Sequence, residues 1–173
     1  MDLKATIRNV QDFPKPGIGF KDITTLLKDP VALKEATARF LSLIGDQKID
    51  KVVGIESRGF VIGGILADKL HAGFIPVRKP KKLPAPVYKE SYTLEYGTDS
   101  IEMHIDAIQP GDNVILHDDL LATGGTAEAA IKLIEKAGGN IVGILFIVEL
   151  SFLNGRAKLG NHPVHALVEY DGE

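Results

Sequence analysis

Runs of apolar residues rich in β-branched side chains recur along the chain, and their hydrophobicity is continuous rather than alternating. The runs cover residues 52–55, 74–77, 114–116 and 141–148. Continuous runs of this kind are typical of strands buried on both faces, as in a parallel sheet. We therefore predict a buried strand at each run.

Segments with helical periodicity separate these runs. The first begins at Asp29-Pro30, a capping and first-turn signal, and its apolar residues recur at helical spacing as far as Ile44. The same pattern covers residues 62–70 and 127–137, and Gly138-Gly139 ends the last helix. The alternation predicts right-handed βαβ units and an α/β fold with a doubly wound, mostly parallel sheet, in a single domain over residues 1–173.

Two segments depart from the alternation. Residues 79–103 contain three prolines in their first half, which excludes a helix or a central strand there. Their second half is typical of a hairpin that turns at residues 97–100. An excursion of this length in a compact domain is usually functional or mobile. Residues 13–20 are rich in turn-forming residues and could form a flap over an edge or a pocket.

The composition is that of an ordinary globular protein. Of the 173 residues, 45% are hydrophobic and 25% are charged, and 20 Lys plus Arg stand against 23 Asp plus Glu, a net charge of −3. This mild acidity argues against binding of nucleic acid or of an anionic membrane through a broad basic surface. No apolar run reaches the length of a membrane span, and no signal-peptide pattern is present, so we expect neither.

Cysteine is absent from the chain. This excludes disulfides, thiolate metal sites and cysteine nucleophiles, and it fits a reducing compartment, so we expect a cytoplasmic protein. The five histidines show no metal-ligand spacing, which argues against a dedicated metal cage.

The richest chemistry follows the third apolar run. Two adjacent carboxylates, Asp118 and Asp119, precede a loop of hydroxyl and glycine residues, 122–126, and the third helical pattern. In open α/β sheets, ligands bind beyond the carboxyl ends of the strands, and glycine N–H groups at a helix N-terminus can cradle a phosphate. The acids suit sugar hydroxyls or a hydrated magnesium ion. This order favours a ligand that carries both a ribose and a phosphate.

A plainer interpretation is that the two acids cap a helix and the glycines form a tight turn. Two familiar nucleotide loops do not fit the segment. No Gly-Lys-Ser/Thr follows, as a Walker-type loop requires, and the third glycine of a dinucleotide fingerprint is missing.

Residues 118–126 read DDLLATGGT, which resembles the phosphoribosyl-pyrophosphate (PRPP) motif of type I phosphoribosyltransferases, in the form typical of the adenine-using members. The resemblance extends over nearly the whole chain. It includes residues 13–23, 56–60, 78–79, 82–84, 91–92, 94–97 and 148–150.

The resemblance implies a purine-salvage enzyme that transfers ribose 5-phosphate from PRPP to N9 of adenine. The products are AMP and pyrophosphate, and Mg²⁺ is bound with PRPP. The resemblance also implies the type I phosphoribosyltransferase fold, with an N-terminal hood over residues 1–30 and a flexible catalytic loop over residues 79–103 that closes over the site. Family members commonly form homodimers, so we expect a homodimer.

The resemblance assigns roles to particular residues. Asp118 and Asp119 match the acid pair that binds the ribose hydroxyls. The 5-phosphate is bound by the loop residues Ala122, Thr123, Gly124, Gly125 and Thr126. The turn that matches Glu56, Ser57 and Arg58 binds pyrophosphate.

Charge should dominate catalysis of such a reaction. Breaking the bond to pyrophosphate leaves positive charge on the sugar and negative charge on the leaving group. Arg58 follows a buried strand at a turn and can bind a phosphate bidentately. Lys79 and Lys82 belong to a basic cluster at the start of the 79–103 excursion and are further candidates for pyrophosphate. The alternative is that this cluster is an ordinary solvated loop.

Glu95 is the candidate acid/base, because a purine that forms a bond at N9 benefits from proton transfer at N7. In the family, the glutamate of the LEYG motif that matches residues 94–97 has this role, and Tyr96 lies beside it near the ribose. The alternative is an exposed glutamate on a hairpin.

The adenine pocket is expected at the N-terminal flap. Phe20 can stack on the purine, the backbone at Gly19 and Lys21 can bind its edge, and Leu120 completes the residues that we assign to adenine. Gly19 and Lys21 stand where an apolar residue and an arginine are common in the family, which bears on the affinity for the base. Ala122 stands where the 6-oxopurine enzymes of the family have an aspartate, which fits the adenine type.

His117 replaces the apolar residue that usually precedes the acid pair. We interpret it as a core histidine with satisfied hydrogen bonds; the alternative is a group that tunes Asp118.

Two alternative functions stay open. One is transfer to another purine base, and the other is a PRPP-sensing regulatory protein that has lost catalysis. Regulators of that kind typically carry an added DNA-binding domain, whereas the enzyme-like pattern uses the whole of this sequence.

Overall fold

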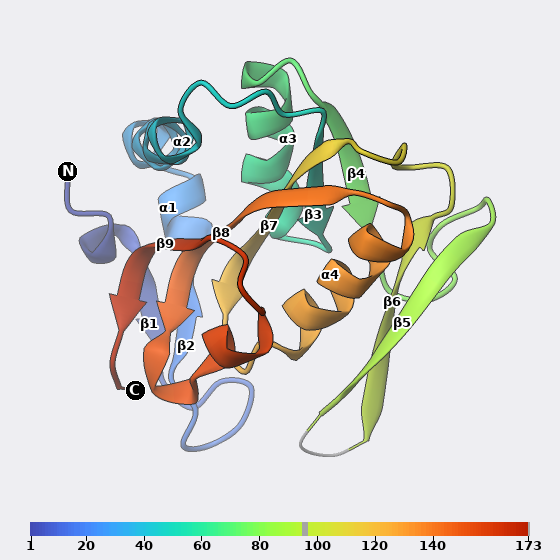
Figure 1. The fold of residues 1–173 in the computed structure, drawn as a ribbon. Helices are drawn as coiled ribbons and strands as arrows, with labels where there is room; N and C mark the ends of the chain where they lie inside the picture. Colours follow the sequence, from blue (N-terminus) through green and yellow to red (C-terminus); the bar gives the residue numbers. More distant parts are fainter. Residues whose placement is uncertain (95–96, 173) are drawn as a thin grey trace.

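A parallel sheet of five strands forms the centre of the fold (Figure 1). The computed structural model describes residues 1–94 and 97–172. The strand order is β4-β3-β7-β8-β9, and every neighbouring pair is parallel. The strands are β3 (Lys51–Ile55), β4 (Gly73–Val77), β7 (Asn113–Leu121), β8 (Asn140–Leu150) and β9 (Val164–Tyr170). This sheet, with helices on both faces, confirms the predicted α/β class.

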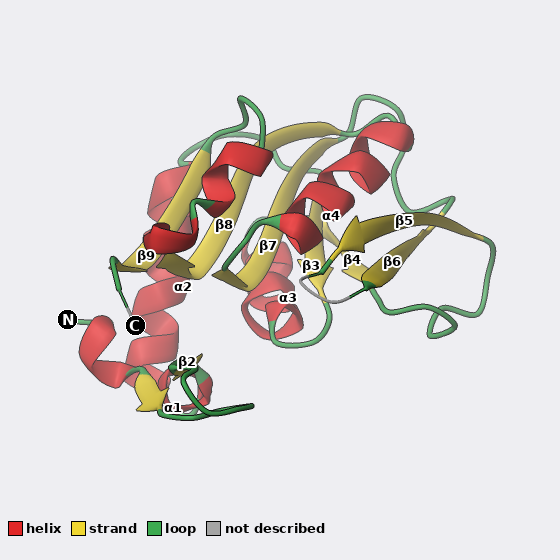
Figure 2. Cartoon of the chain, turned by 90° about the horizontal axis from the view of Figure 1, so that it is seen from below, coloured by secondary structure: helices red, strands yellow, loops and turns green. Residues whose placement is uncertain are grey.

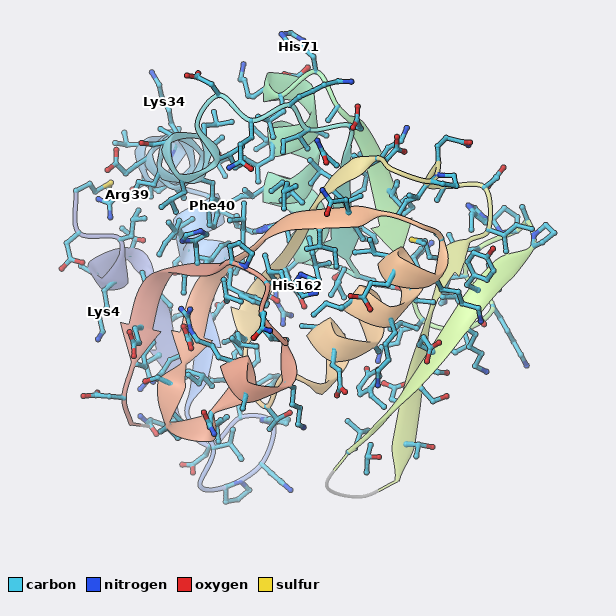
Figure 3. The ribbon with its side chains drawn as sticks, in the orientation of Figure 1. Lys4, Lys34, Arg39, Phe40, His71 and His162 are labelled. Carbon is cyan, nitrogen blue, oxygen red and sulfur yellow. The ribbon has the colours of Figure 1, made fainter. Side chains whose placement is uncertain are left out.

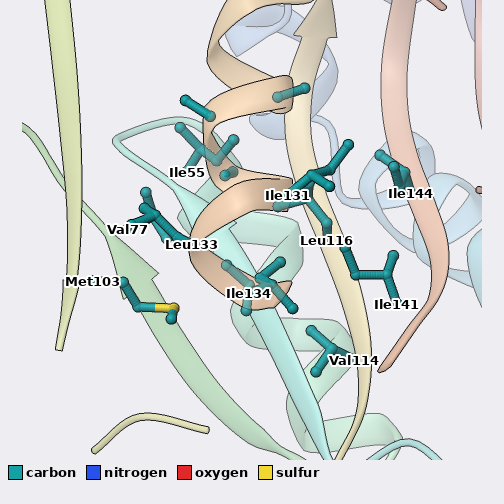
Figure 4. Close-up of a cluster of buried hydrophobic side chains, with 14 of the residues drawn as sticks. Ile55, Val77, Met103, Val114, Leu116, Ile131, Leu133, Ile134, Ile141 and Ile144 are labelled. Atoms are coloured by element: carbon teal, nitrogen blue, oxygen red, sulfur yellow. The ribbon is translucent and has the colours of Figure 1, made fainter. Parts of the chain in front are cut away.

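Helices cover both faces of the sheet (Figure 2). On one face α4 (Gly125–Lys136) buries a cluster of aliphatic side chains, seen in Figure 4. On the other face α2 (Pro30–Ile44) and α3 (Gly59–Lys69) bury a second cluster around Phe40. Because both faces are covered, β3, β4, β7 and β8 each contain a continuous apolar run, which is why these four strands were predicted correctly.

Local signals fix the ends of the predicted helices. The Asp29 carboxylate accepts hydrogen bonds from the N–H groups of Val31 and Ala32 at 2.8 and 3.2 Å, with Pro30 in the first turn. Gly138 follows α4 at a φ of 85°, a left-handed conformation that glycine adopts without strain. The predicted capping and stop signals are therefore confirmed.

Strand β7 is longer than predicted. It continues past the apolar run to Leu121, and its last described pair with β8 is Leu121↔Glu149. Asp118 and Asp119 therefore lie within the strand and not in the loop after it. The fifth strand, β9, was not predicted, because its sequence mixes polar and apolar residues and most of its side chains are only half-buried at the sheet edge.

Two antiparallel hairpins flank the carboxyl ends of the sheet strands (Figure 1). One pairs β1 (Arg8–Val10) with β2 (Phe20–Asp22). The other pairs β5 (Val87–Thr93) with β6 (Thr98–His104). The predicted turn at 97–100 was wrong in its position, because Thr98 already pairs with Thr93 in the ladder. Residues 95 and 96 lie outside the described residues.

Short helical segments complete the chain. They are η1 (Lys4–Thr6), α1 (Thr24–Leu27), η2 (Ser151–Leu153) and η3 (Gly155–Lys158). Among the described residues, no helix combines the length and the apolar character that crossing a membrane would require.

His117 lies in the core behind the acid pair. Its ring is fully buried, 5.4 Å between centroids from Phe40, which points from α2 toward the sheet in Figure 3. Nδ1 lies 3.0 Å from the Leu145 carbonyl oxygen, but Nε2 has no hydrogen-bond partner among the described residues. The expectation of a fully satisfied histidine was therefore right for one ring nitrogen only. Burial lowers the pKa of His117 to about 4, so the ring is neutral at pH 7.

The buried neutral His117 should make the fold sensitive to acid. In the unfolded chain a histidine binds its proton below about pH 6.5, whereas in the fold His117 does so only near pH 4. The contribution of His117 to the free energy of unfolding is therefore fully present above pH 6.5 and is lost as the pH falls toward 4. Between pH 7 and 5 this group alone should remove about 2 kcal/mol from the free energy of unfolding.

The test is urea unfolding of wild type and His117→Leu at pH 7 and at pH 5. The variant should lose less stability than wild type over this interval, by about 2 kcal/mol. His71→Asn is the matched control, because His71 is exposed (Figure 3) and its loss should leave the wild-type difference. If His117→Leu lost as much stability between pH 7 and pH 5 as wild type does, His117 would not be the source of the acid sensitivity.

Candidate functional site

A small hollow lies where β7 leads into α4. It measures about 80 Å³ and is lined by the loop residues 122–126 together with Asp118 and Leu120. Gly124, at a φ of 85°, turns the chain into the helix. The first N–H groups of an α-helix have no partner within the helix, so this hollow can bind an anion of phosphate size. The structure thus brings together the five loop residues predicted for the phosphate.

The loop rests on a second glycine that sequence reasoning missed. A Cβ at Gly155 would lie 2.3 Å from the carbonyl oxygen of Ala122, and a Cβ at Gly124 would lie 2.5 Å from that of Gly155. Neither position has room for a side chain. The signal in the sequence was weak, because Asn154-Gly155 looks like any surface turn.

A larger hollow of about 420 Å³ opens beside the first and shares Asp118 and Thr126 with it. Its walls come from the turn between β3 and α3, the segment after β4, the end of β7 and the β5–β6 hairpin. The predicted residues that line it are Glu56, Ser57, Arg58, Lys79, Asp118, Asp119 and Thr126. Lys82 is exposed and lies outside this lining.

An ion pair joins two walls of this larger hollow. The Arg58 Nε lies 2.5 Å from the Asp119 Oδ2. Partial loss of hydration alone would lower the pKa of Arg58, but the hydrogen bond to Asp119 and the charge of that carboxylate raise it. Loss of hydration and the charge of Asp119 raise the pKa of Asp118. Gly59 permits the close approach, since a Cβ there would lie 3.0 Å from an Asp118 carboxylate oxygen.

The Glu56 side chain is engaged within the protein. Its carboxylate accepts two hydrogen bonds from Arg78, at 3.1 and 3.3 Å, and one from the Lys79 N–H at 2.8 Å. Burial alone would raise the pKa of Glu56, but these bonds lower it. The Glu56–Ser57 peptide bond is cis. Because a carboxylate repels an anion, the turn can offer a phosphate only its backbone, Ser57 and Arg58.

Lys79 reaches across to the β5–β6 hairpin. Its Nζ forms an ion pair with Asp99 and lies 3.1 Å from the Tyr92 hydroxyl. Tyr92 and Asp99 are opposite each other in the ladder, so both side chains are on one face. Sequence reasoning missed these two partners. The two-residue period of the strands could have placed them together once the turn position was right.

A third hollow of about 320 Å³ lies under the β1–β2 hairpin and shares Arg58 with the second. Its walls include Phe13 and Phe20, whose rings meet edge to face with centroids 5.1 Å apart. The Arg58 guanidinium carbon lies 5.5 Å from the centroid of the Phe20 ring. Each hollow therefore shares at least one lining residue with the next.

The other residues predicted for adenine are not among those that line the third hollow. The Lys21 ammonium donates to the Asn9 Oδ1 at 3.0 Å and lies 4.6 Å from the centroid of the Tyr170 ring, so its side chain points away from the third hollow. Gly19 is not among the residues that line this hollow, and Leu120 lines the smallest hollow instead. The predicted Glu95 and Tyr96 lie outside the described residues.

Comparison with known proteins decides the family. A sequence profile described as the phosphoribosyl transferase domain matches residues 22–162. Adenine phosphoribosyltransferase of Christiangramia forsetii is 58% identical over 170 residues, 98% of this chain and 99% of that protein. This chain belongs to the adenine phosphoribosyltransferase family.

Solved structures of the family agree with this fold. Adenine phosphoribosyltransferase of Rhodothermus marinus superposes with a TM-score of 0.93 at 58% identity, covering 97% of this chain and 96% of that one. The Saccharomyces cerevisiae enzyme, solved with adenine and an imino-altritol bisphosphate, superposes with a TM-score of 0.90 at 42% identity, covering 96% of each chain. The recognition of the family from its motifs is therefore confirmed.

Gly155→Ala should damage the phosphate loop. The added methyl group would overlap the Ala122 carbonyl, so we expect the free energy of unfolding to fall by about 1–3 kcal/mol and the affinity for ribose 5-phosphate to fall with it. Urea unfolding measures the change in stability, and calorimetry measures the change in affinity.

Gly64→Ala is the matched control for this substitution. Gly64 lies in α3, and the space that an alanine methyl group would occupy there is open, so alanine should be neutral or stabilising by up to about 1 kcal/mol. If Gly155→Ala behaved like Gly64→Ala, the close contact would not constrain the loop.

Proposed function

We propose that this protein transfers ribose 5-phosphate from PRPP to N9 of adenine and releases AMP and pyrophosphate. The observation that carries this proposal is the three adjoining hollows in a chain of this family. PRPP carries a 5-phosphate at one end of its ribose and a diphosphate at the other, and the base must lie beside the ribose. The two substrates together therefore need three such compartments in this order.

Each compartment suits one part of the substrates. The loop 122–126 binds the 5-phosphate, and Asp118 and Asp119 accept hydrogen bonds from the ribose hydroxyls. Arg58 and Lys79 bind the diphosphate in the larger hollow. The base lies against Phe20 in the third hollow, where Arg58 connects it to the sugar. Lys82 and the backbone at Gly19 and Lys21 remain candidate contacts.

The reaction breaks the bond between C1 of the ribose and a diphosphate oxygen and forms a bond between C1 and N9. Positive charge develops on the sugar and negative charge on the leaving group, so Asp118 and Asp119 stabilise the first and Arg58 and Lys79 the second. The base must lose its proton as the new bond forms. Glu95 is our candidate to exchange protons with the base, and Tyr96 is expected beside it.

Magnesium is proposed to enter with PRPP. Among the described residues, no three acidic or histidine side chains gather as a protein cage for the ion would require, and Asp119 already pairs with Arg58. The chain therefore fits an ion that would be held mainly by the diphosphate and ribose oxygens, and Asp118 is the residue that would accept hydrogen bonds from its waters. When bound, the ion neutralises charge on the leaving diphosphate.

Homodimer formation, cytoplasmic location, and the division of one domain into a hood and a catalytic loop stay predictions. The name shared by the full-length relatives supports an enzyme over a PRPP-sensing regulator.

A base-selection assay tests the proposed function. Pyrophosphate release is measured with PRPP, Mg²⁺ and either adenine or hypoxanthine. We expect turnover with adenine and little with hypoxanthine, because Ala122 provides no carboxylate for the N7 of a 6-oxopurine. Turnover with hypoxanthine and none with adenine would support the alternative of another purine base.

Glu95→Gln tests the acid/base assignment. Losing a general acid/base typically slows a reaction by 10²–10⁴-fold, so we expect turnover to fall by about 100-fold or more while PRPP still binds. Steady-state kinetics gives the first and calorimetry the second. Unchanged turnover would remove Glu95 from the mechanism.

A further inference from the structure

The cations that line the diphosphate compartment are already paired with carboxylates of the protein. Arg58 pairs with Asp119, which the proposed function uses for the ribose. Lys79 pairs with Asp99, a residue to which the proposed function gives no role. Asp99 therefore needs a separate explanation.

The surroundings of Asp99 hold its carboxylate on the Lys79 ammonium. Tyr92, directly opposite in the ladder, donates from its hydroxyl to the Asp99 Oδ2 at 3.1 Å. The Ser100 N–H donates to the other carboxylate oxygen at 2.8 Å. The bond to Lys79, with smaller help from Ser100 and Tyr92, lowers the pKa of Asp99. Asp99 is thus a fixed anion beside a cation that faces the hollow.

Lys79 keeps other contacts that do not depend on Asp99. Its Nζ lies 3.1 Å from the Tyr92 hydroxyl and 5.7 Å from the centroid of the Tyr92 ring. The Tyr92 ring in turn lies close to Gly125 of the loop 122–126, where an added Cβ would be 3.4 Å from the ring. Loss of the Asp99 charge would therefore leave the ammonium at the wall of the hollow.

We propose that Asp99 is an internal counter-ion for Lys79, which the diphosphate of PRPP displaces on binding and which reclaims Lys79 when pyrophosphate leaves. This inference rests on the proposed function, because it takes the larger hollow to be the diphosphate compartment. A carboxylate oxygen and a phosphate oxygen accept the same charge-assisted hydrogen bond from an ammonium group. Asp99 then weakens diphosphate binding, and so limits how tightly the product pyrophosphate is held.

The sign of the effect separates this role from a purely structural one. If Asp99 only positions Lys79, its removal should weaken anion binding. If Asp99 competes with the anion, its removal should strengthen binding. The pair is partly exposed, with 44% and 32% of the Lys79 and Asp99 side chains accessible, so the change should be modest, at about three- to fivefold in Kd.

The experiment measures binding of inorganic pyrophosphate, at fixed Mg²⁺, to the full chain by calorimetry. Asp99→Asn should lower the Kd by about three- to fivefold and lower the inhibition constant of pyrophosphate in the forward reaction by the same factor. Asp99→Ser is the second variant, for the case that asparagine disturbs folding. Weaker or unchanged binding in a folded Asp99 variant would overturn the proposal.

Two controls identify the route of the effect. Asp106→Asn makes the same charge change at an exposed residue after β6 that lies outside the lining of the hollow, and it should leave the Kd unchanged. In a Lys79→Gln background, Asp99→Asn should no longer tighten binding, because the competing cation is gone. Equal tightening in that background, or with Asp106→Asn, would indicate only the general field of the protein.

Failure of this proposal can be told from failure of the proposed function. If wild type turns over adenine with PRPP but Asp99→Asn does not tighten pyrophosphate binding, the counter-ion role is wrong and the activity stands. If wild type neither turns over adenine nor binds pyrophosphate, the proposed function is wrong, and the counter-ion role falls with it.

Discussion

Two adjacent carboxylates have to stand at the carboxyl end of a strand that is otherwise buried, and much of the surrounding structure compensates for them. The pairing of β7 with β8 extends to Leu121 and fixes both acids in a strand, so neither has the conformational freedom of a loop residue. Arg58 offsets the charge of Asp119, while loss of hydration and the charge of Asp119 raise the pKa of Asp118. Gly59 lets the helix that follows this arginine begin against Asp118. The neutral His117 behind them adds no charge of its own.

The same principle governs the cationic side of the site. Arg58, Arg78 and Lys79 pair with Asp119, Glu56 and Asp99 respectively, so these opposed charges offset one another in and beside the larger hollow. A cation without a counter-ion would lose hydration there with no compensation. The Glu56–Arg78 pair also joins the ends of β3 and β4. This pair therefore positions the turn that carries Ser57 and Arg58. Because Arg78 does not line the larger hollow, an anion can bind there without breaking the pair.

Sequence reasoning predicted the parts of this fold whose signals are local. The buried strands are recognisable by continuous hydrophobicity, α2 by its cap at Asp29, and the loop 122–126 by its glycines between a strand and a helix. The parts it missed depend on contacts between distant residues. Gly155 matters only because the Ala122 carbonyl approaches it. The edge strand β9 mixes polar and apolar residues and has no clear strand pattern until it pairs with β8. The direction of the Lys21 side chain depends on the pairing of β1 with β2. Lys21 lies opposite Asn9 in this hairpin, and its ammonium group contacts Asn9 and the Tyr170 ring.

The position of Arg58 explains how one turn can contribute to both the second and the third hollow. It precedes α3, pairs with Asp119 beside the proposed ribose site, lines the diphosphate hollow and lies over the ring of Phe20. A planar guanidinium can make an in-plane ion pair and offer its face to an aromatic ring at the same time, which an ammonium group cannot do. Any ligand group that draws Arg58 away from Asp119 must therefore alter the wall of the base compartment as well. The proposed diphosphate and base sites are in this way linked through a single side chain, and no movement of the sheet is needed to connect them.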